Sequence, residues 1–150
     1  MTSKAVVQDF LAQKTLAVVG VSRRGNKFGN MAYRELKAKG YRVYPVHPNA
    51  ETVEGDKAYP NLSALPEKPG GVLVIVPPTQ AEKVVQDAAQ AGIQRVWLQQ
   101  GAESPAAIQF CKDKGIRVVH NECIMMFAEP VGFGHKAHRW VWGLLSKLPK

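Results

Sequence analysis

The stretch KAKGYRVYPV, residues 37–46, ends a helix-like segment at a glycine and continues as a run rich in β-branched and aromatic residues. The same arrangement recurs in AQAGIQRVWL, residues 89–98, and in KDKGIRVVHN, residues 112–121. Each glycine suits the C-terminus of a helix, because a left-handed backbone costs glycine little. Helix, glycine and strand in repeated order are typical of a parallel sheet covered by helices.

The rest of the chain extends this pattern. Strands are expected near residues 15–20, 42–47, 72–76, 95–99 and 117–120, and helices near residues 4–12, 30–39, 79–91 and 104–114. Asn30, Thr79 and Ser104 are the expected N-caps of the last three helices. The prediction is an α/β fold, a doubly wound parallel five-stranded sheet in the order 3-2-1-4-5 with helices on both faces.

The composition is that of an ordinary globular protein, with 45% hydrophobic and 21% charged residues. The 150 residues are expected to form one domain, 1–150, with a C-terminal helical extension at 123–150. No apolar run approaches the roughly 20 residues that span a bilayer, and the N-terminus lacks a signal-peptide core. We therefore expect a cytoplasmic protein without a membrane span, in which Cys111 and Cys123 are reduced thiols.

The formal net charge of +8 favours an anionic ligand or partner. A basic surface attracts nucleic acid, and a basic pocket attracts a polyphosphate. Because the basic residues are spread along the chain without a block of five like charges, no specific nucleic-acid partner is expected.

Ligands of doubly wound sheets bind beyond the carboxyl ends of the strands. The loop GVSRRGNKFGN, residues 20–30, follows the first expected strand and has the features of a phosphate site. Gly20 allows a sharp turn, Ser22 offers a hydroxyl, and the next helix directs its positive N-terminus at the loop. Arg23, Arg24 and Lys27 add positive charge, and Gly29 permits close approach at the helix start.

The candidate phosphate ligands differ in the residues they require. The loop is not a clean G-x-G-x-x-G, and VYPVHPN, residues 43–49, lacks the carboxylate that holds the ribose of NAD. NAD is therefore disfavoured, whereas NADP stays open because a basic residue suits its extra phosphate. The sequence has no Walker-type loop.

The four histidines do not form a catalytic or metal pattern. His47 and His120 lie at strand ends, where hydrogen-bonding or packing roles are expected. His135 and His138 are three residues apart but have no clear third partner, so we expect no metal site. No catalytic residue is assigned.

Residues 14–126 resemble the CoA-binding domain, the Rossmann-like module of the succinyl-CoA synthetase α subunit and of small stand-alone CoA-binding proteins. The resemblance rests on the order and spacing of VVGVS, GYRVYPVHPN, YPNLSALPEKPGGVLVIVPP, GIQRVWLQQGAES and GIRVVHNEC. It implies that the phosphates of coenzyme A are held by Gly20, Ser22, Arg23 and Lys27. It places beside the nucleotide Pro48, Val76, Pro77 and Thr79. It places near the pantetheine arm Gln100 and Gly101, and at the corner after the fifth strand Asn121 and Cys123.

The resemblance also implies a function. The synthetase uses a phosphorylated histidine in a second domain, which this chain is not expected to contain. The expected function is therefore binding of coenzyme A or an acyl-CoA without catalysis. The alternatives are an NADP-binding oxidoreductase module and an accessory subunit of an acyl-CoA ligase whose chemistry lies on a partner chain.

Overall fold

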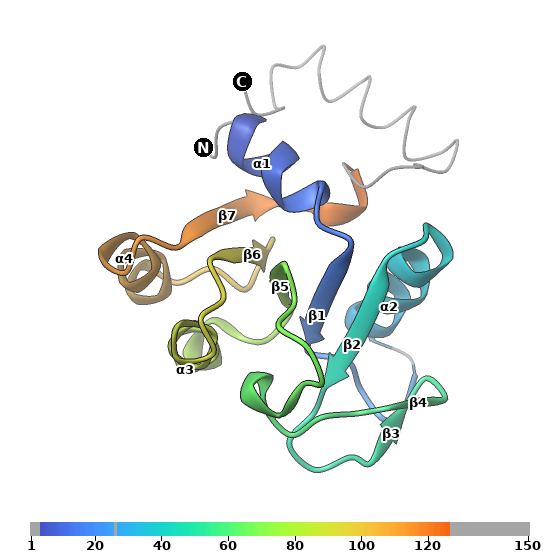
Figure 1. The fold of residues 1–150 in the computed structure, drawn as a ribbon. Coiled ribbons are helices and arrows are strands. Elements are labelled where there is room, and N and C mark those ends of the chain that lie inside the picture. The colour runs from blue at the N-terminus through green and yellow to red at the C-terminus, as the bar shows by residue number, and fades with distance from the viewer. Residues whose placement is uncertain (1–3, 26, 127–150) are drawn as a thin grey trace.

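The computed structural model describes residues 4–25 and 27–126, and its centre is a parallel five-stranded sheet (Figure 1). The strands are β1 (Thr15–Val19), β2 (Arg42–Val46), β5 (Gly71–Val74), β6 (Arg95–Gln99) and β7 (Arg117–Glu122). They are ordered β2-β1-β5-β6-β7, and every neighbouring pair is parallel. The predicted α/β fold is confirmed.

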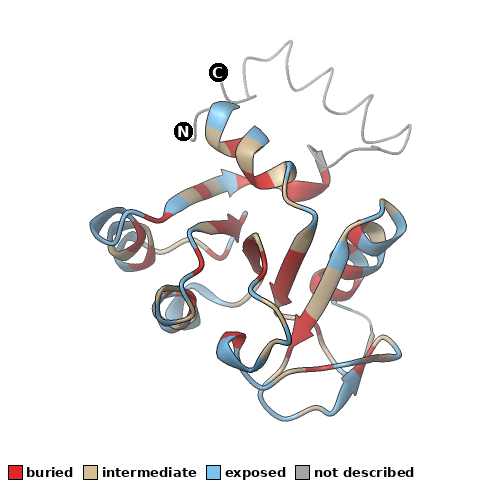
Figure 2. Ribbon diagram, viewed as in Figure 1, coloured by how far each residue is buried: buried red, intermediate tan, exposed pale blue. Residues whose placement is uncertain are grey.

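Helices cover both faces of this sheet. The cluster that includes α1 (Lys4–Leu11) and α2 (Phe28–Ala38) packs Phe10, Leu36 and Trp97 on one face. The cluster on the other face includes α3 (Pro78–Gln90) and α4 (Pro105–Asp113). All four residues of β5 are buried, as Figure 2 shows for the centre of the sheet, because this strand is covered from both sides.

The predicted strand order 3-2-1-4-5 is wrong, because the third long strand, β5, pairs with β1. The chain from β2 to β5 contains no long helix. It forms a hairpin of β3 (Thr52–Val53) and β4 (Asp56–Lys57) and a short 3-10 helix, η1 (Leu62–Ala64). Leu62 packs in the α3 cluster, so the connection crosses that face and delivers β5 to the far side of β1. The strand order still reverses beside β1, which keeps the predicted ligand edge.

The helix starts confirm one of three predicted caps. Ser104 accepts a hydrogen bond from the Ala107 backbone N–H at 3.0 Å, as an N-cap does. Thr79 caps nothing, because α3 begins one residue earlier, at a proline whose fixed φ suits the first helical position. Asn30 lies inside α2, where its side chain contacts Ser22 instead.

Replacing Ser104 by alanine is expected to lower the free energy of unfolding by about 1 kcal/mol, because an N–H at the start of α4 loses its acceptor. Thr79→Ala is the matched control and should change this free energy by less than about 0.5 kcal/mol. Urea unfolding followed by circular dichroism measures both. Equal losses in the two variants would contradict the assignment of the cap.

Most of the predicted C-terminal extension, 123–150, lies outside the described residues, which reach only to the 3-10 helix η2 (Ile124–Met126). Within the described part of the chain, no helix has the length and apolar character needed to cross a membrane.

Candidate functional site

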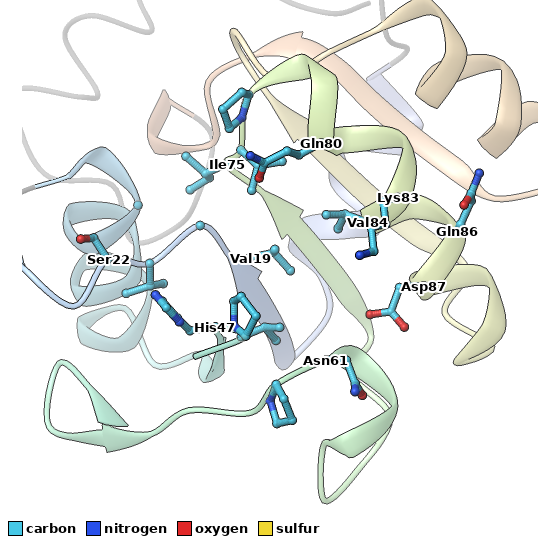
Figure 3. Close-up of a pocket in the computed structure, with 18 of the residues that line it drawn as sticks. Val19, Ser22, His47, Asn61, Ile75, Gln80, Lys83, Val84, Gln86 and Asp87 are labelled. Carbon is cyan, nitrogen blue, oxygen red and sulfur yellow. The ribbon is translucent and has the colours of Figure 1, made fainter. Parts of the chain in front are cut away.

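A cleft of about 1260 Å³ opens at the carboxyl edge of the sheet (Figure 3). Its floor is apolar and includes Val19 and Val46 at the ends of β1 and β2. The loop after β1, the connection after β2 and α3 form its walls. The cleft therefore lies where the strand order reverses, as expected of a ligand site in this fold. Seven predicted site residues line it: Gly20, Ser22, Lys27, Pro48, Val76, Pro77 and Thr79.

Two glycines let the start of α2 pack directly on the end of β1. Gly20 has a φ of +123°, and a Cβ there would lie 2.0 Å from the carbonyl oxygen of Ile75. A Cβ on Gly29, in the first turn of α2, would lie 2.3 Å from the carbonyl oxygen of Gly20. The close approach seen at Gly29 is therefore that of the helix start to the end of β1. It brings the N-terminus of α2, with its first N–H groups and positive dipole end, to the margin of the cleft.

The Ser22 peptide is held by a buried side chain. Its N–H donates to Asn30 Oδ1 at 2.9 Å, and its carbonyl oxygen accepts from Asn30 Nδ2 at 2.7 Å. Ser22 Oγ accepts from the Arg24 backbone N–H at 3.1 Å. Because a hydroxyl also carries one proton, Ser22 keeps a donor for a group outside this loop. Figure 3 shows Ser22 at one margin of the cleft.

His47 has a structural role at the end of β2. Its Nδ1 accepts from the backbone N–H groups of Asn49 and Ala50, each at 3.0 Å. Burial, and secondly the positive charge of Arg23, hold the pKa of His47 below its ordinary value. The imidazole is therefore neutral at pH 7 and carries its proton on Nε2. This arrangement agrees with the hydrogen-bonding role predicted from the sequence.

The opposite wall consists of polar residues that the sequence analysis missed. Asp87 on α3 accepts from the Leu62 N–H at 3.0 Å and so ties α3 to η1. Asn61 caps η1 by accepting from the Ala64 N–H at 2.9 Å. Lys83, one turn before Asp87, directs its amine toward the cleft in Figure 3. The spacing of Gln80, Lys83 and Asp87 on one helical stripe is the signal that could have identified this wall.

The remaining predicted residues lie outside the cleft lining. Arg23 is on the loop after β1, and its charge reaches His47. Gln100 and Gly101 follow β6, and the Gln100 N–H donates to the Glu122 carbonyl oxygen at 3.2 Å. Asn121 has a φ of +62° where the β6–β7 register shifts.

Cys123 is half-buried and packs against the hydrophobic cluster that contains α1. The predicted residues at the ends of β6 and β7 therefore form a second group, which lies further along the same edge of the sheet than the cleft: Gln100, Gly101, Asn121 and Cys123. Cys111 and Cys123 are both free thiols. Among residues 4–25 and 27–126, no three His, Cys, Asp or Glu side chains are grouped to hold a metal ion. His135 and His138 lie outside these residues.

Comparison with known proteins agrees with this geometry. A family model described as "CoA binding domain" matches residues 14–129. The Bacillus subtilis protein YneT is 30% identical over 123 residues, which are 81% of this chain and 91% of YneT. The ADP-forming acetate–CoA ligase II of Archaeoglobus fulgidus is 29% identical over 75% of this chain. The match covers only 18% of that ligase.

Among solved structures, this chain is likewise similar to a protein of comparable length and to part of a larger synthetase. A protein of Pyrococcus horikoshii OT3 superposes with a TM-score of 0.77 at 30% identity, covering 83% of this chain and 88% of the other. The dinucleotide-forming acetyl-coenzyme A synthetase 1 of Ca. Korarchaeum cryptofilum superposes with a TM-score of 0.64 at 28% identity. That match covers 72% of this chain and 26% of the synthetase.

Proposed function

Because this chain belongs to the CoA-binding domain family, we propose that it binds coenzyme A or an acyl-CoA in the cleft, without catalysis of its own. The observation that carries the proposal is the cleft itself. Its size, about 1260 Å³, exceeds the roughly 300–1,000 Å³ of typical small-ligand sites, so it has room for the nucleotide and the pyrophosphate of coenzyme A. The N-terminus of α2 and Lys27 give one end a positive potential that suits phosphate.

The parts of coenzyme A are assigned along the sheet edge. The pyrophosphate lies at the loop after β1, against Gly20, Ser22, Arg23 and Lys27. The adenine nucleotide occupies the apolar part of the cleft, between Pro48 and the residues Val76, Pro77 and Thr79. The pantetheine arm continues toward the ends of β6 and β7, where Gln100, Gly101, Asn121 and Cys123 lie. The residues assigned to the nucleotide and the pyrophosphate therefore follow the three neighbouring strands β2, β1 and β5, and those assigned to the pantetheine arm lie at the ends of the next two strands, β6 and β7.

The positions of the carboxylates near the loop favour coenzyme A over NAD as the ligand. The segment just after β2 presents His47 and Pro48 to the cleft, and neither is acidic. Glu54 lies near the loop but is paired with Asn30 and Arg34. Asp87, on the far wall, is engaged with the Leu62 N–H. The arrangement thus lacks, among the described residues, the strand-end carboxylate that holds an NAD ribose.

Isothermal titration with coenzyme A, acetyl-CoA, NADP and ATP tests the proposal. Coenzyme A is expected to bind at least tenfold more tightly than NADP, a difference of about 1.4 kcal/mol. Acetyl-CoA should bind similarly, because the acyl group is remote from the phosphates. Heat from NADP without heat from coenzyme A would overturn the assignment in favour of an oxidoreductase module.

A second candidate is an accessory subunit of a cytoplasmic acyl-CoA ligase whose chemistry lies on a partner chain. The match to part of the acetate–CoA ligase II of Archaeoglobus fulgidus favours it. The free thiols Cys111 and Cys123 are consistent with a reducing compartment. Affinity purification of the tagged chain from its own cells should recover a larger ligase subunit. Purification of the chain alone, with coenzyme A retained, would favour the stand-alone function.

A further inference from the structure

Asn30 connects the cleft to the β3–β4 hairpin. Its side chain is fully buried on α2 and makes three hydrogen bonds. Two hold the N–H and the carbonyl oxygen of Ser22, as described above. In the third, Asn30 Nδ2 donates to Glu54 Oε2 at 2.8 Å. Glu54 belongs to the turn between β3 and β4, 24 residues further along the chain.

The carboxylate of Glu54 reinforces the orientation of the Asn30 amide that the N–H and the carbonyl oxygen of Ser22 require. An ionised carboxylate only accepts hydrogen bonds, so the NH2 group of Asn30 must face Glu54. The oxygen Oδ1 must then face the Ser22 N–H, which needs an acceptor. Hydrogen bonds from Asn30 and Arg34 hold the pKa of Glu54 below its ordinary value, so the group is ionised at pH 7. A neutral amide in place of Glu54 can turn its own NH2 group toward Asn30, so this reinforcement is lost and only the two hydrogen bonds to Ser22 hold the Asn30 side chain.

Glu54 is itself held firmly against α2. Its Oε1 accepts from Arg34 at 2.9 Å, and its backbone has a φ of +53°, a left-handed conformation unusual for glutamate. Asp56, two residues on, pairs with Lys37 at 2.7 Å and accepts from the Tyr33 hydroxyl. The hairpin is therefore attached to α2 at two points, of which only the one at Glu54 reaches the loop after β1.

We propose that Glu54 is a positioning residue for the ligand's phosphate, acting through Asn30 on the Ser22 peptide. This inference rests on the proposed binding of coenzyme A at that loop. When Asn30 is correctly oriented, the Ser22 peptide is fixed from both sides, and Ser22 Oγ can accept the Arg24 N–H. The loop is then preorganised, which raises affinity because less order must be imposed on binding.

The test compares coenzyme A affinities of five proteins by titration calorimetry: wild type, Glu54→Gln, Asp56→Asn, Asn30→Asp and the double variant Asn30→Asp/Glu54→Gln. Glu54→Gln is expected to weaken binding about tenfold, the effect of losing a hydrogen bond to a charged group. Asp56→Asn is the matched control, because it loosens the same hairpin without touching Asn30, and should change affinity less than about twofold.

The double variant gives a sign reversal that general loosening of the hairpin would not produce. In Asn30→Asp, a carboxylate faces Glu54 and the Ser22 carbonyl oxygen, so binding should weaken more than in Glu54→Gln. Adding Glu54→Gln removes the repulsion between the two carboxylates and supplies an N–H donor, so the same change that harms the wild type should strengthen binding here. Equal effects of Glu54→Gln and Asp56→Asn, or additive losses in the double variant, would overturn the proposal.

Amide hydrogen exchange at the Ser22 N–H separates this inference from the proposed function and needs no ligand. Exchange should be slow in wild type and Asp56→Asn and at least fivefold faster in Glu54→Gln. If wild-type protein does not bind coenzyme A, the proposed function fails, and exchange alone decides whether Glu54 positions Ser22. Unchanged exchange in a folded Glu54→Gln variant would overturn the inference. Exchange at the Ser22 N–H can still be compared between wild type and Glu54→Gln if the Asn30→Asp variant does not fold.

Discussion

Gly20→Ala is expected to lower the free energy of unfolding by about 4 kcal/mol, combining strain at a positive φ with overpacking. The added Cβ would lie 2.0 Å from the carbonyl oxygen of Ile75, a backbone atom that moves only if β5 or the end of β1 moves. The φ of +123° is itself outside the region that alanine favours. The backbone strain and the clash with the carbonyl oxygen of Ile75 add to each other, because rotating a side chain relieves neither.

Gly40→Ala separates these two contributions. Gly40 has a φ of +99°, but a Cβ there would meet no atom within 4 Å. This variant should therefore lose only the strain contribution, about 1–2 kcal/mol. The urea midpoint, compared at constant m-value, measures both losses. Equal losses at Gly20 and Gly40 would show that β1 and β5 do not approach as closely as described.

The parts of the fold that depend on local sequence could be predicted. The glycine that ends a helix and the β-branched run that follows are signals within ten residues, and they located three of the five long strands, β2, β6 and β7. Ser104 was identified as an N-cap for the same reason, because its partner, Ala107, is three residues away. The loop after β1 was identified from its glycines and basic residues, although the atom that Gly20 approaches, the carbonyl oxygen of Ile75, is distant in the sequence.

Features that depend on distant partners could not be predicted. Asn30 looks like an N-cap from its neighbours, but its side chain is occupied by Ser22 and by Glu54, 24 residues away. The strand order depends on how residues 47–70 cross the sheet, and two-residue strands such as β3 give no periodic signal. The polar wall at Lys83 and Asp87 becomes part of the cleft only because that connection folds back over α3.

Lys27→Glu is expected to weaken coenzyme A binding by about 100-fold, because it reverses a charge beside the site proposed for phosphate. Lys27 lines the cleft and is the N-cap of α2, so its amine and the helix dipole both favour an anion there. A carboxylate at this position repels the phosphates and competes for the same N–H groups. The side chain is exposed and makes no cap hydrogen bond, so its replacement leaves the packing of the helix unchanged.

The direction of the helix dipole makes this variant informative about binding rather than folding. A negative charge at a helix N-terminus stabilises the helix by about 0.3–1 kcal/mol, so Lys27→Glu should unfold no more easily than wild type. Lys14→Glu is the control, because it makes the same change in net charge at an exposed position just before β1, at the opposite edge of the sheet. It should leave the affinity within about threefold of wild type at 0.15 M salt, where charges beyond about 8 Å are screened. Titration calorimetry on both variants decides the matter: similar weakening by Lys14→Glu would mean that net charge, and not the N-terminus of α2, attracts the ligand.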